Sequence, residues 1–216
     1  MNKQQIAKQH ILESLMRTAP VVPVVIVDDV RRAVAMAKAL VRGGLPVIEV
    51  TLRTARALDC LEAIAAEVPD AMPGAGTVLE KSQIKAVEEA GARFMVSPGA
   101  APKLLDAAED SEVPLLPGTA TPGEMMTLGE RGYRHLKFFP ASVAGGSPFL
   151  KALASPLPMF RYCPTGGISA ANAREYLALP NVLCVGGSWV APQVAIDNGD
   201  VDEIERLARD AASLPR

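Results

Sequence analysis

Residues 21–30 read VVPVVIVDDV, and this stretch decides the fold. The β-branched run 21–27 predicts a buried strand, and Asp28 and Asp29 are typical helix caps before apolar residues at helical spacing. In dinucleotide-binding doubly wound sheets the first strand is followed by Gly-x-Gly-x-x-Gly, which does not stand here. The turn therefore favours a closed barrel over an open sheet built from the same strand-helix units.

The same unit recurs along the whole chain. Turns follow the predicted strands about every 20 to 26 residues, which gives eight strand-helix units without a break in composition. We therefore predict an α/β protein: one (β/α)8 TIM barrel domain over residues 1–216. After the first strand, the predicted strands are 46–52, 71–75, 93–97, 113–116, 135–139, 159–163 and 182–185.

An additional N-terminal helix is predicted within residues 1–18. It should lie across the bottom of the barrel and bury one apolar side. The residues predicted on that side are Ile6, Ile11, Leu12, Leu15 and Met16.

Composition excludes several classes of partner. Of 216 residues, 22 are basic and 24 acidic, with no block of either sign, which argues against nucleic acid or an anionic membrane. Three cysteines without a CxxC pair are expected in a reduced cytoplasmic protein. No apolar run is long enough to span a bilayer, and no signal peptide is recognisable.

The second predicted strand carries polar residues where a barrel strand is normally apolar. Glu49, Thr51 and Arg53 alternate with apolar neighbours and should share the face that points into the barrel. An interior carboxylate and guanidinium are costly unless they are paired or functional. We interpret the face as part of a functional site; a structural Glu49–Arg53 or Glu49–Lys137 ion pair is the alternative.

Lys137 stands in the middle of the apolar strand His135-Leu136-Lys137-Phe138-Phe139. Lysine is almost never buried without a partner or a chemical role. Apolar surroundings favour the neutral amine, which attacks carbonyl compounds to form a Schiff base. Taken alone, this segment equally allows Lys137 to extend out of the strand end into solvent.

Glycine-rich turns follow the last two predicted strands. Gly166-Gly167 and Gly186-Gly187-Ser188 should expose backbone N–H groups at the barrel rim, where barrels commonly bind phosphate. A histidine-rich metal site is not expected, because only His10 and His135 exist. We expect His10 to face solvent and His135 to be structural or partly exposed near the bottom of the barrel.

These motifs together resemble one family. The chain is similar to 2-keto-3-deoxy-6-phosphogluconate (KDPG) aldolase, also called 4-hydroxy-2-oxoglutarate (KHG) aldolase. The resemblance runs from about Val21 to the C-terminal helix. The matching segments are 49–53 (EVTLR), 74–77 (GAGT), 97–99 (SPG), 137–140 (KFFP), 164–167 (PTGG) and 186–188 (GGS).

The resemblance implies a metal-independent class I aldolase of the Entner-Doudoroff pathway, without a cofactor and usually homotrimeric. Its substrates would be a phosphorylated keto sugar acid and pyruvate. Many relatives have Glu at the position of Ser142. The implied roles are Schiff base for Lys137, proton transfer for Glu49, carboxylate binding for Arg53 and Thr77, pocket lining for Pro98, and phosphate binding for Gly166, Gly167, Gly187 and Ser188.

Two other functions remain open from the residues alone. A phosphate-binding barrel isomerase, epimerase or synthase would share the glycine turns but would not need Lys137 opposite Glu49. A non-catalytic metabolite-binding protein would bind pyruvate without a covalent adduct.

Overall fold

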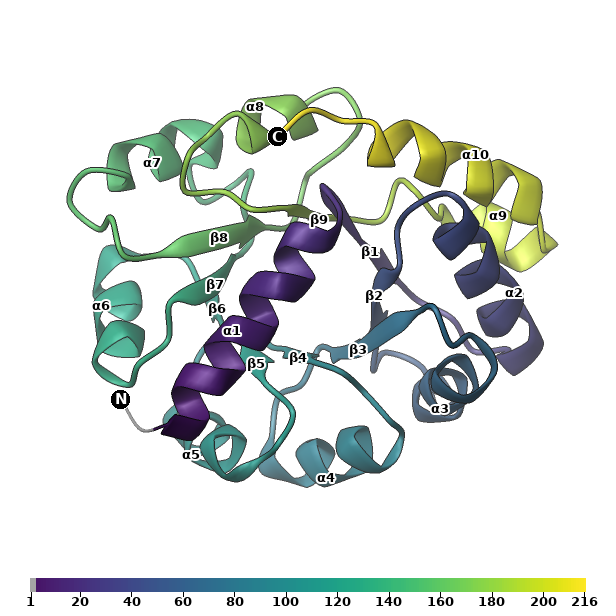
Figure 1. The fold of residues 1–216 in the computed structure, drawn as a ribbon, viewed down its shortest axis with the longest axis horizontal. Helices are drawn as coiled ribbons and strands as arrows, with labels where there is room; N and C mark the ends of the chain where they lie inside the picture. Colours follow the sequence, from purple (N-terminus) through teal and green to yellow (C-terminus); the bar gives the residue numbers. More distant parts are fainter. Residues whose placement is uncertain (1–2) are drawn as a thin grey trace.

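The structure is a computed structural model and describes residues 3–216. A curled parallel sheet lies at the centre and helices surround it (Figure 1). Within the described residues, no helix is both long and apolar enough to cross a membrane. The strands are β1 (Val21–Val25), β2 (Val47–Thr51), β3 (Met72–Gly76), β4 (Met95–Val96), β5 (Leu115–Leu116), β6 (Gly118–Thr119), β7 (His135–Phe138), β8 (Arg161–Pro164) and β9 (Val185–Gly187). The helices are α1 (Lys3–Thr18), α2 (Val30–Arg42), α3 (Ala57–Glu67), α4 (Lys81–Glu89), α5 (Pro102–Asp110), α6 (Pro122–Glu130), α7 (Gly146–Leu153), α8 (Ala173–Leu177), α9 (Gln193–Asn198) and α10 (Val201–Ala212).

Strand pairing confirms the predicted parallel α/β architecture. The hydrogen-bonded order is β5-β4-β3-β2-β1-β9 in one sheet and β6-β7-β8 in the other. Two isolated parallel bridges, Tyr162 with Val182 and Thr165 with Gly186, connect the chain around β8 to the chain around β9. The bridges therefore link the three-stranded sheet, which ends at β8, to the six-stranded sheet, which ends at β9.

The predicted strand 113–116 is wrong at both ends. Its first paired residue is Leu115, and pairing resumes beyond the predicted end in β6. Pro117 separates the two pieces, since it has no N–H to donate, although its carbonyl still accepts a hydrogen bond from Lys137 N. The prediction 182–185 is also displaced, because β9 begins only at Val185. The predicted strand ends are wrong because an apolar run indicates which residues are buried, and more residues are buried than form strand pairs.

The packing of α2 shows why the helices form and where the outer core lies. The side chain of Asp29 accepts a hydrogen bond from Arg32 N at 2.9 Å and thereby caps the helix. Its inner face places Ala33, Met36 and Leu40, all 1% exposed or less, in the large apolar cluster between helices and strands. Ile48 of β2 belongs to the same cluster, so this layer holds helices against the outside of the sheet.

Helix α1 lies across the amino ends of the strands (Figure 1). Leu12, Leu15 and Met16 join a second apolar cluster with strand residues such as Phe94 and Cys184. This confirms the predicted helix, although residues 1 and 2 lie outside the described part of the chain.

The predicted apolar side of α1 is only partly correct. Ile6 and Ile11 are 36% and 44% exposed, whereas the polar Lys8 and Gln9 are buried. Lys8 Nζ donates to Ala108 O at 3.1 Å and to Glu109 O at 2.8 Å. At this end α1 lies against the last turn of α5 and the start of β7, and polar side chains satisfy carbonyl and N–H groups that apolar ones would leave unpaired.

The two histidines lie as expected relative to the strands. His10 is exposed on α1, and His135, at the amino end of β7, is 5% exposed. His135 Nδ1 lies 3.1 Å from Gln9 Oε1, which also accepts hydrogen bonds from the backbone N–H groups of Arg134 and His135. Burial lowers the pKa of His135 to about 4, although the nearby Glu13 carboxylate opposes this shift. His135 therefore has a structural role, because its contact with Gln9 helps to hold α1 against β7.

Candidate active site

Strand β2 carries the polar face that the alternation predicts. Ile48 and Val50 are fully buried against the helices, while Glu49 faces the interior and is 4% exposed. Thr51 Oγ1 donates to Val25 O at 2.8 Å, which fixes the end of the strand against β1. Arg53 follows and is exposed at the carboxyl end. The strand thus positions a carboxylate deep inside and a guanidinium at the rim.

Lys137 of β7 meets Glu49 across the interior. Its Nζ donates to Glu49 Oε1 at 3.2 Å and lies 3.5 Å from Oε2, with both side chains less than a tenth exposed. The ammonium also lies 5.3 Å from the centre of the Phe139 ring. A buried pair of this kind contributes little net stability when intact but is costly to break. Lys137 therefore does not extend into solvent, and the observed pair is Glu49–Lys137 instead of Glu49–Arg53.

Gly76 of β3 makes room for this pair. A Cβ atom at position 76 would overlap the carboxylate of Glu49. Any other residue here would displace Glu49 from Lys137. The glycine is therefore required by the position of the carboxylate.

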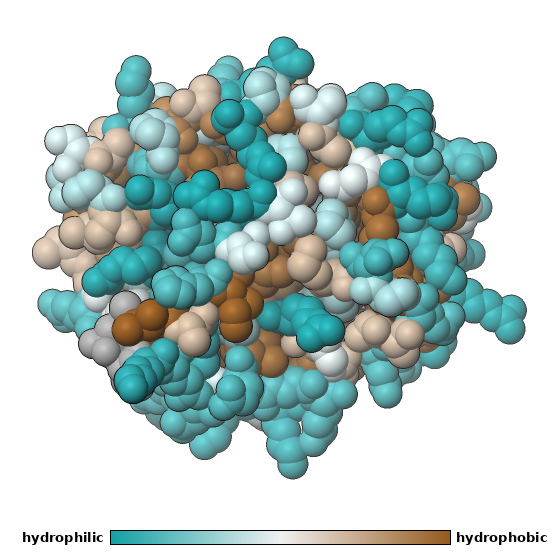
Figure 2. All heavy atoms as spheres, viewed as in Figure 1, coloured by the Kyte–Doolittle hydropathy of each residue, from teal (hydrophilic) through white to brown (hydrophobic). Residues whose placement is uncertain are grey.

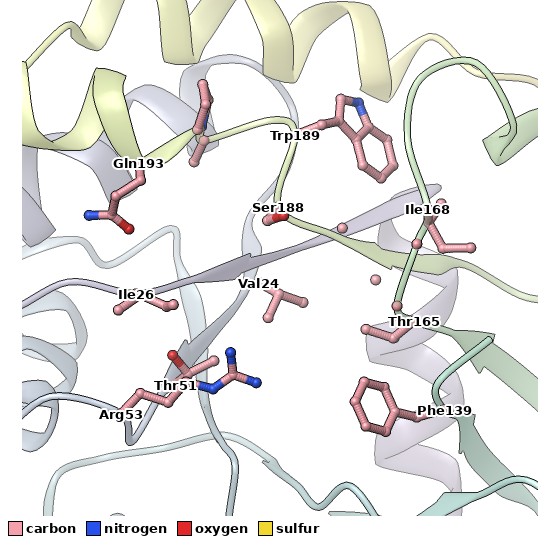
Figure 3. A pocket seen from close by; sticks show the side chains of 16 residues that line it. Val24, Ile26, Thr51, Arg53, Phe139, Thr165, Ile168, Ser188, Trp189 and Gln193 are labelled. Carbon is pink, nitrogen blue, oxygen red and sulfur yellow. The ribbon is translucent and has the colours of Figure 1, made fainter. Parts of the chain in front are cut away.

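A cavity of about 650 Å³ opens at the carboxyl ends of the strands (Figure 3). Among the described residues that line it, Arg53 is the only charged side chain, so the cavity suits an anion. Figure 3 shows Arg53 and Phe139 on opposite sides of this space. The lining residues are Val24, Ile26, Thr51, Arg53, Phe139, Thr165, Gly166, Gly167, Ile168, Gly186, Gly187, Ser188, Trp189, Ala191, Pro192 and Gln193.

The turn after β8 depends on its two glycines. Gly166 has φ +98° and Gly167 has φ +75°, a backbone region that side chains strongly disfavour. Asn172 fixes the turn, since its Nδ2 donates to Gly167 O at 2.9 Å and its Oδ1 accepts from Ser169 N at 2.8 Å. This holds the glycine backbone at the cavity wall, where both residues were predicted.

The structure brings most, but not all, of the predicted site residues together. Arg53 and the four predicted phosphate-binding residues line the cavity. Thr77 and Pro98 do not; Thr77 is half-buried just after β3, and the backbone of Pro98 packs so closely on Gly118 that a Cβ there would overlap it. Their predicted roles, Thr77 near the substrate carboxylate and Pro98 near Lys137, therefore remain predictions. The two residues follow β3 and β4, which β2 and β1 separate from β9 in the sheet, and linear spacing does not reveal this separation.

Lys137 and Glu49 lie below the cavity and not on its wall. They border a hollow of about 20 Å³ that is otherwise lined mainly by the apolar cluster under α1. Thr165 lines both spaces, so they lie on either side of this residue. Its Oγ1 donates to Cys163 O at 3.4 Å.

Sequence reasoning missed Thr165, Phe139 and Trp189 as site residues. Thr165 and Phe139 stand within the matched segments, directly before the glycine pair and two residues after Lys137. The ring of Trp189 occupies the space where a side chain at Gly187 would lie. The only tryptophan in the chain, directly after a predicted phosphate-binding serine, was the available signal.

Ser142 lies beside the glycine turn. Its N–H donates to Gly166 O at 3.0 Å, and its hydroxyl occupies the position that a Cβ of Gly167 would take. The residue that differs from many relatives is thus a neighbour of the predicted phosphate-binding backbone. Within residues 3–216, no group of three or more His, Cys, Asp or Glu is placed to hold a metal ion.

Known proteins are similar to this chain over most of its length. The KHG/KDPG aldolase of Escherichia coli strain K12 is 53% identical over 199 residues, which is 92% of this chain and 93% of that protein. The 2-dehydro-3-deoxy-phosphogluconate aldolase of Pseudoalteromonas atlantica is 52% identical over 90% of each chain.

A solved structure extends the likeness to the fold. KDPG aldolase from Legionella pneumophila, with pyruvate captured at low pH as a covalent carbinolamine intermediate, superposes with a TM-score of 0.91 at 46% identity. The match covers 93% of this chain and 98% of that one. The family model of KDPG and KHG aldolase matches residues 12–207, and this chain belongs to that family.

Proposed function

We propose that this chain is a class I aldolase that cleaves KDPG to pyruvate and glyceraldehyde 3-phosphate. The observation that carries the proposal is the buried Lys137–Glu49 pair beneath a cavity whose only charged lining residue, within the described chain, is Arg53. Cleavage of 4-hydroxy-2-oxoglutarate to pyruvate and glyoxylate is the second activity, favoured by the name of the Escherichia coli relative.

Lys137 supplies the electron sink. Its neutral amine attacks the C2 carbonyl of the substrate and expels water to form a protonated imine. When the C3–C4 bond breaks, its electron pair moves into the imine and gives an enamine. The Phe139 ring and the apolar residues around the small hollow keep bulk water away from the nitrogen.

Glu49 moves the protons. It takes the proton from the C4 hydroxyl, directly or through a water, as the aldehyde leaves, and it returns a proton to C3 of the enamine. Water then hydrolyses the imine and releases pyruvate. The 3.2 Å contact with Lys137 Nζ also places Glu49 to receive the proton that the ammonium must lose before attack.

The remaining predicted site residues bind the ends of the substrate. Arg53 holds the carboxylate, because a guanidinium can bind both oxygens. The backbone of Gly166, Gly167 and Gly187 and the Ser188 hydroxyl hold the phosphate. Binding at this remote end orients the bond that breaks. Thr77 contributes to the neighbourhood of the carboxylate, and Pro98 lines the pocket near Lys137.

We also propose the finer architecture that the sequence predicts. The chain is one domain, and its two sheets form one closed (β/α)8 barrel; the isolated bridges between β8 and β9, and the short break at Pro117, support closure. The family resemblance supports a cytoplasmic homotrimer without a cofactor. Sedimentation equilibrium gives the oligomeric state directly.

The test is borohydride reduction of the protein with pyruvate, followed by peptide mass spectrometry. A reduced pyruvyl adduct on Lys137 supports the imine mechanism, and Lys137→Arg serves as the matched variant without adduct. An adduct on another lysine contradicts the site. Retained cleavage by Lys137→Arg favours an isomerase, epimerase or synthase, and reversible pyruvate binding without an adduct favours a non-catalytic binding protein.

A further inference from the structure

A second cavity lies at the opposite ends of the same strands. It encloses about 620 Å³ and shares no lining residue with the cavity at the carboxyl ends. Its wall combines the last turn of α1, the first residue of β8, the segment that follows α8 and the last residue of the chain. The lining residues are Arg17, Arg161, Leu177, Ala178, Leu179, Pro180, Val182, Leu183 and Arg216.

We propose that this cavity binds a small organic polyanion, a molecule with a short carbon skeleton and at least two carboxylate or phosphate groups. The proposal does not depend on the catalytic assignment, because no residue is shared between the two cavities.

Charge is the first argument. Three guanidinium groups line one small cavity and no acidic side chain does, in a protein whose net charge is -2. Arg17 is paired with Glu13 at 2.9 Å. Neither Arg161 nor Arg216 forms an ion pair with a carboxylate within residues 3–216. Arg161 and Arg216 therefore bring two guanidinium groups to the cavity wall that no acidic side chain of residues 3–216 pairs with.

The second argument is that these arginines are held in place. Arg161 Nη1 donates to Pro158 O at 2.9 Å and to Phe160 O at 2.8 Å. Arg216 Nη1 donates to the backbone carbonyl of Arg17 at 2.7 Å. In each residue these contacts use only one end of the guanidinium, so the other N–H donors remain for a ligand. A donor that is already fixed loses less entropy when it binds.

Shape and polarity define the class of ligand. The apolar side chains of Leu177, Val182 and Leu183 form part of the wall, and the volume lies within the range of small-molecule sites. Figure 2 shows this α1 side of the molecule, where hydrophilic residues dominate the edge of the face and hydrophobic residues are visible between others. A nucleic acid or an acidic protein needs an extended basic surface, and the charges here gather around one hollow. A compact polyanion with an apolar carbon skeleton would bind the arginines through its anionic groups and contact the apolar side chains through its skeleton.

The test is isothermal titration of the full-length protein with citrate and, separately, with pyrophosphate. We expect citrate to bind wild type and to bind the double variant R161Q/R216Q at least tenfold more weakly. R31Q removes an exposed arginine outside the cavity and should bind like wild type. R53Q separates the two sites, because it alters only the carboxyl-end cavity. If R161Q prevents folding, R216Q alone should still weaken binding measurably.

Three results would overturn the proposal: no binding of either anion at millimolar concentration, equal binding by wild type and R161Q/R216Q, or loss of binding in R53Q alone. If pyrophosphate binds more tightly than citrate and with the same arginine dependence, the site prefers phosphate groups; the reverse order assigns polycarboxylates.

Discussion

The two ends of the curled sheet are built from the same strands and differ in what fills them. At the carboxyl ends, glycine turns and the Arg53 side chain border an open space of about 650 Å³. At the amino ends, Leu12, Leu15 and Met16 of α1 pack onto the strands and leave a hollow of only about 20 Å³ beneath the helix, while the cavity of about 620 Å³ lies beside the last turn of α1. Lys137 and Glu49 lie between the two regions.

The residues at the amino ends of the strands therefore mainly stabilise the fold, and those at the carboxyl ends mainly bind and convert the substrate. The amino end buries apolar side chains at close packing, which contributes free energy of folding. The carboxyl end has small residues and exposed donors, which contribute little to folding but leave room for a substrate. Substitutions at the two ends should therefore affect different measurements.

The largest effect is expected from Glu49→Gln. The amide has the same shape as the carboxylate but cannot accept the C4 hydroxyl proton, so kcat should fall by about 10²–10⁴-fold. Borohydride should still trap pyruvate on Lys137, although more slowly, because the amide cannot take the proton from the ammonium. Single-turnover kinetics and mass spectrometry measure the two steps, with the exposed Glu62→Gln as control. Unchanged kcat would remove Glu49 from the mechanism.

Leu12→Ala tests the amino end. Leu12 is 1% exposed, and its truncation should lower the free energy of unfolding by about 2–5 kcal/mol. Its neighbour Ile11 is 44% exposed, so Ile11→Ala is a matched control with an effect below about 0.5 kcal/mol. Urea denaturation measures both. Equal losses would mean that α1 does not pack as described; the kcat of folded Leu12→Ala should stay near that of wild type.

His135 should make the amino end sensitive to acid. Its pKa is about 4 in the folded protein against 6.5 as the ordinary value, so the unfolded chain takes up a proton first as the pH falls. Stability is retained above pH 6.5 and decreases between pH 6.5 and 4, by about 3 kcal/mol in total. Denaturation midpoints of wild type and His135→Asn at pH 7.5, 5.5 and 4.5 measure this. A pH dependence that is the same in both proteins would contradict the assignment.

Ser188→Ala should act only on the phosphate end of the substrate. Loss of one hydrogen bond to a charged group costs about 1.5–3 kcal/mol, or roughly tenfold or more in KM for KDPG. The KM for 4-hydroxy-2-oxoglutarate, which has no phosphate, should not change. Equal effects on the two substrates would place the phosphate elsewhere.

Ser142→Glu should have the smallest effect. The new carboxylate would lie beside Gly167, where repulsion of a phosphate in water is worth about 1 kcal/mol, a few-fold in KM for KDPG. Ser142→Gln, of similar size but neutral, controls for bulk. Identical kinetics of the two variants would show that charge at this position is unimportant.

Much of the fold could be predicted because burial and strand-helix alternation are written in local sequence. Val21–Val25 and Val47–Thr51 lie within predicted strands, and the polar face of β2 turned inward as expected. The break at Pro117 and the polar contacts of Lys8 could not be predicted, because each depends on which backbone groups a distant segment presents.

The candidate site divides in the same way. Lys137 and Gly166 were recognisable because each violates its local pattern, a charge in an apolar strand and a glycine pair at a strand end. The paired contact between Lys137 and Glu49 was one of two alternatives until the structure decided. Thr77 and Pro98 fit the motifs equally well but lie outside the cavity, since motif order does not define which rim positions converge.

The cluster beneath α1 also has a consequence for the order of synthesis. Leu12 and Met16 pack in the same cluster as Leu183 and Cys184, more than 160 residues later in the chain. During translation α1 emerges long before these two partners, so its apolar face can pack on earlier residues such as Val22 and Val47 but the cluster is completed only when the chain around β9 follows. Contacts of such large sequence separation slow folding and leave apolar surface exposed until they form. Helix α1 therefore reaches its complete native packing only after the chain around β9 has been made.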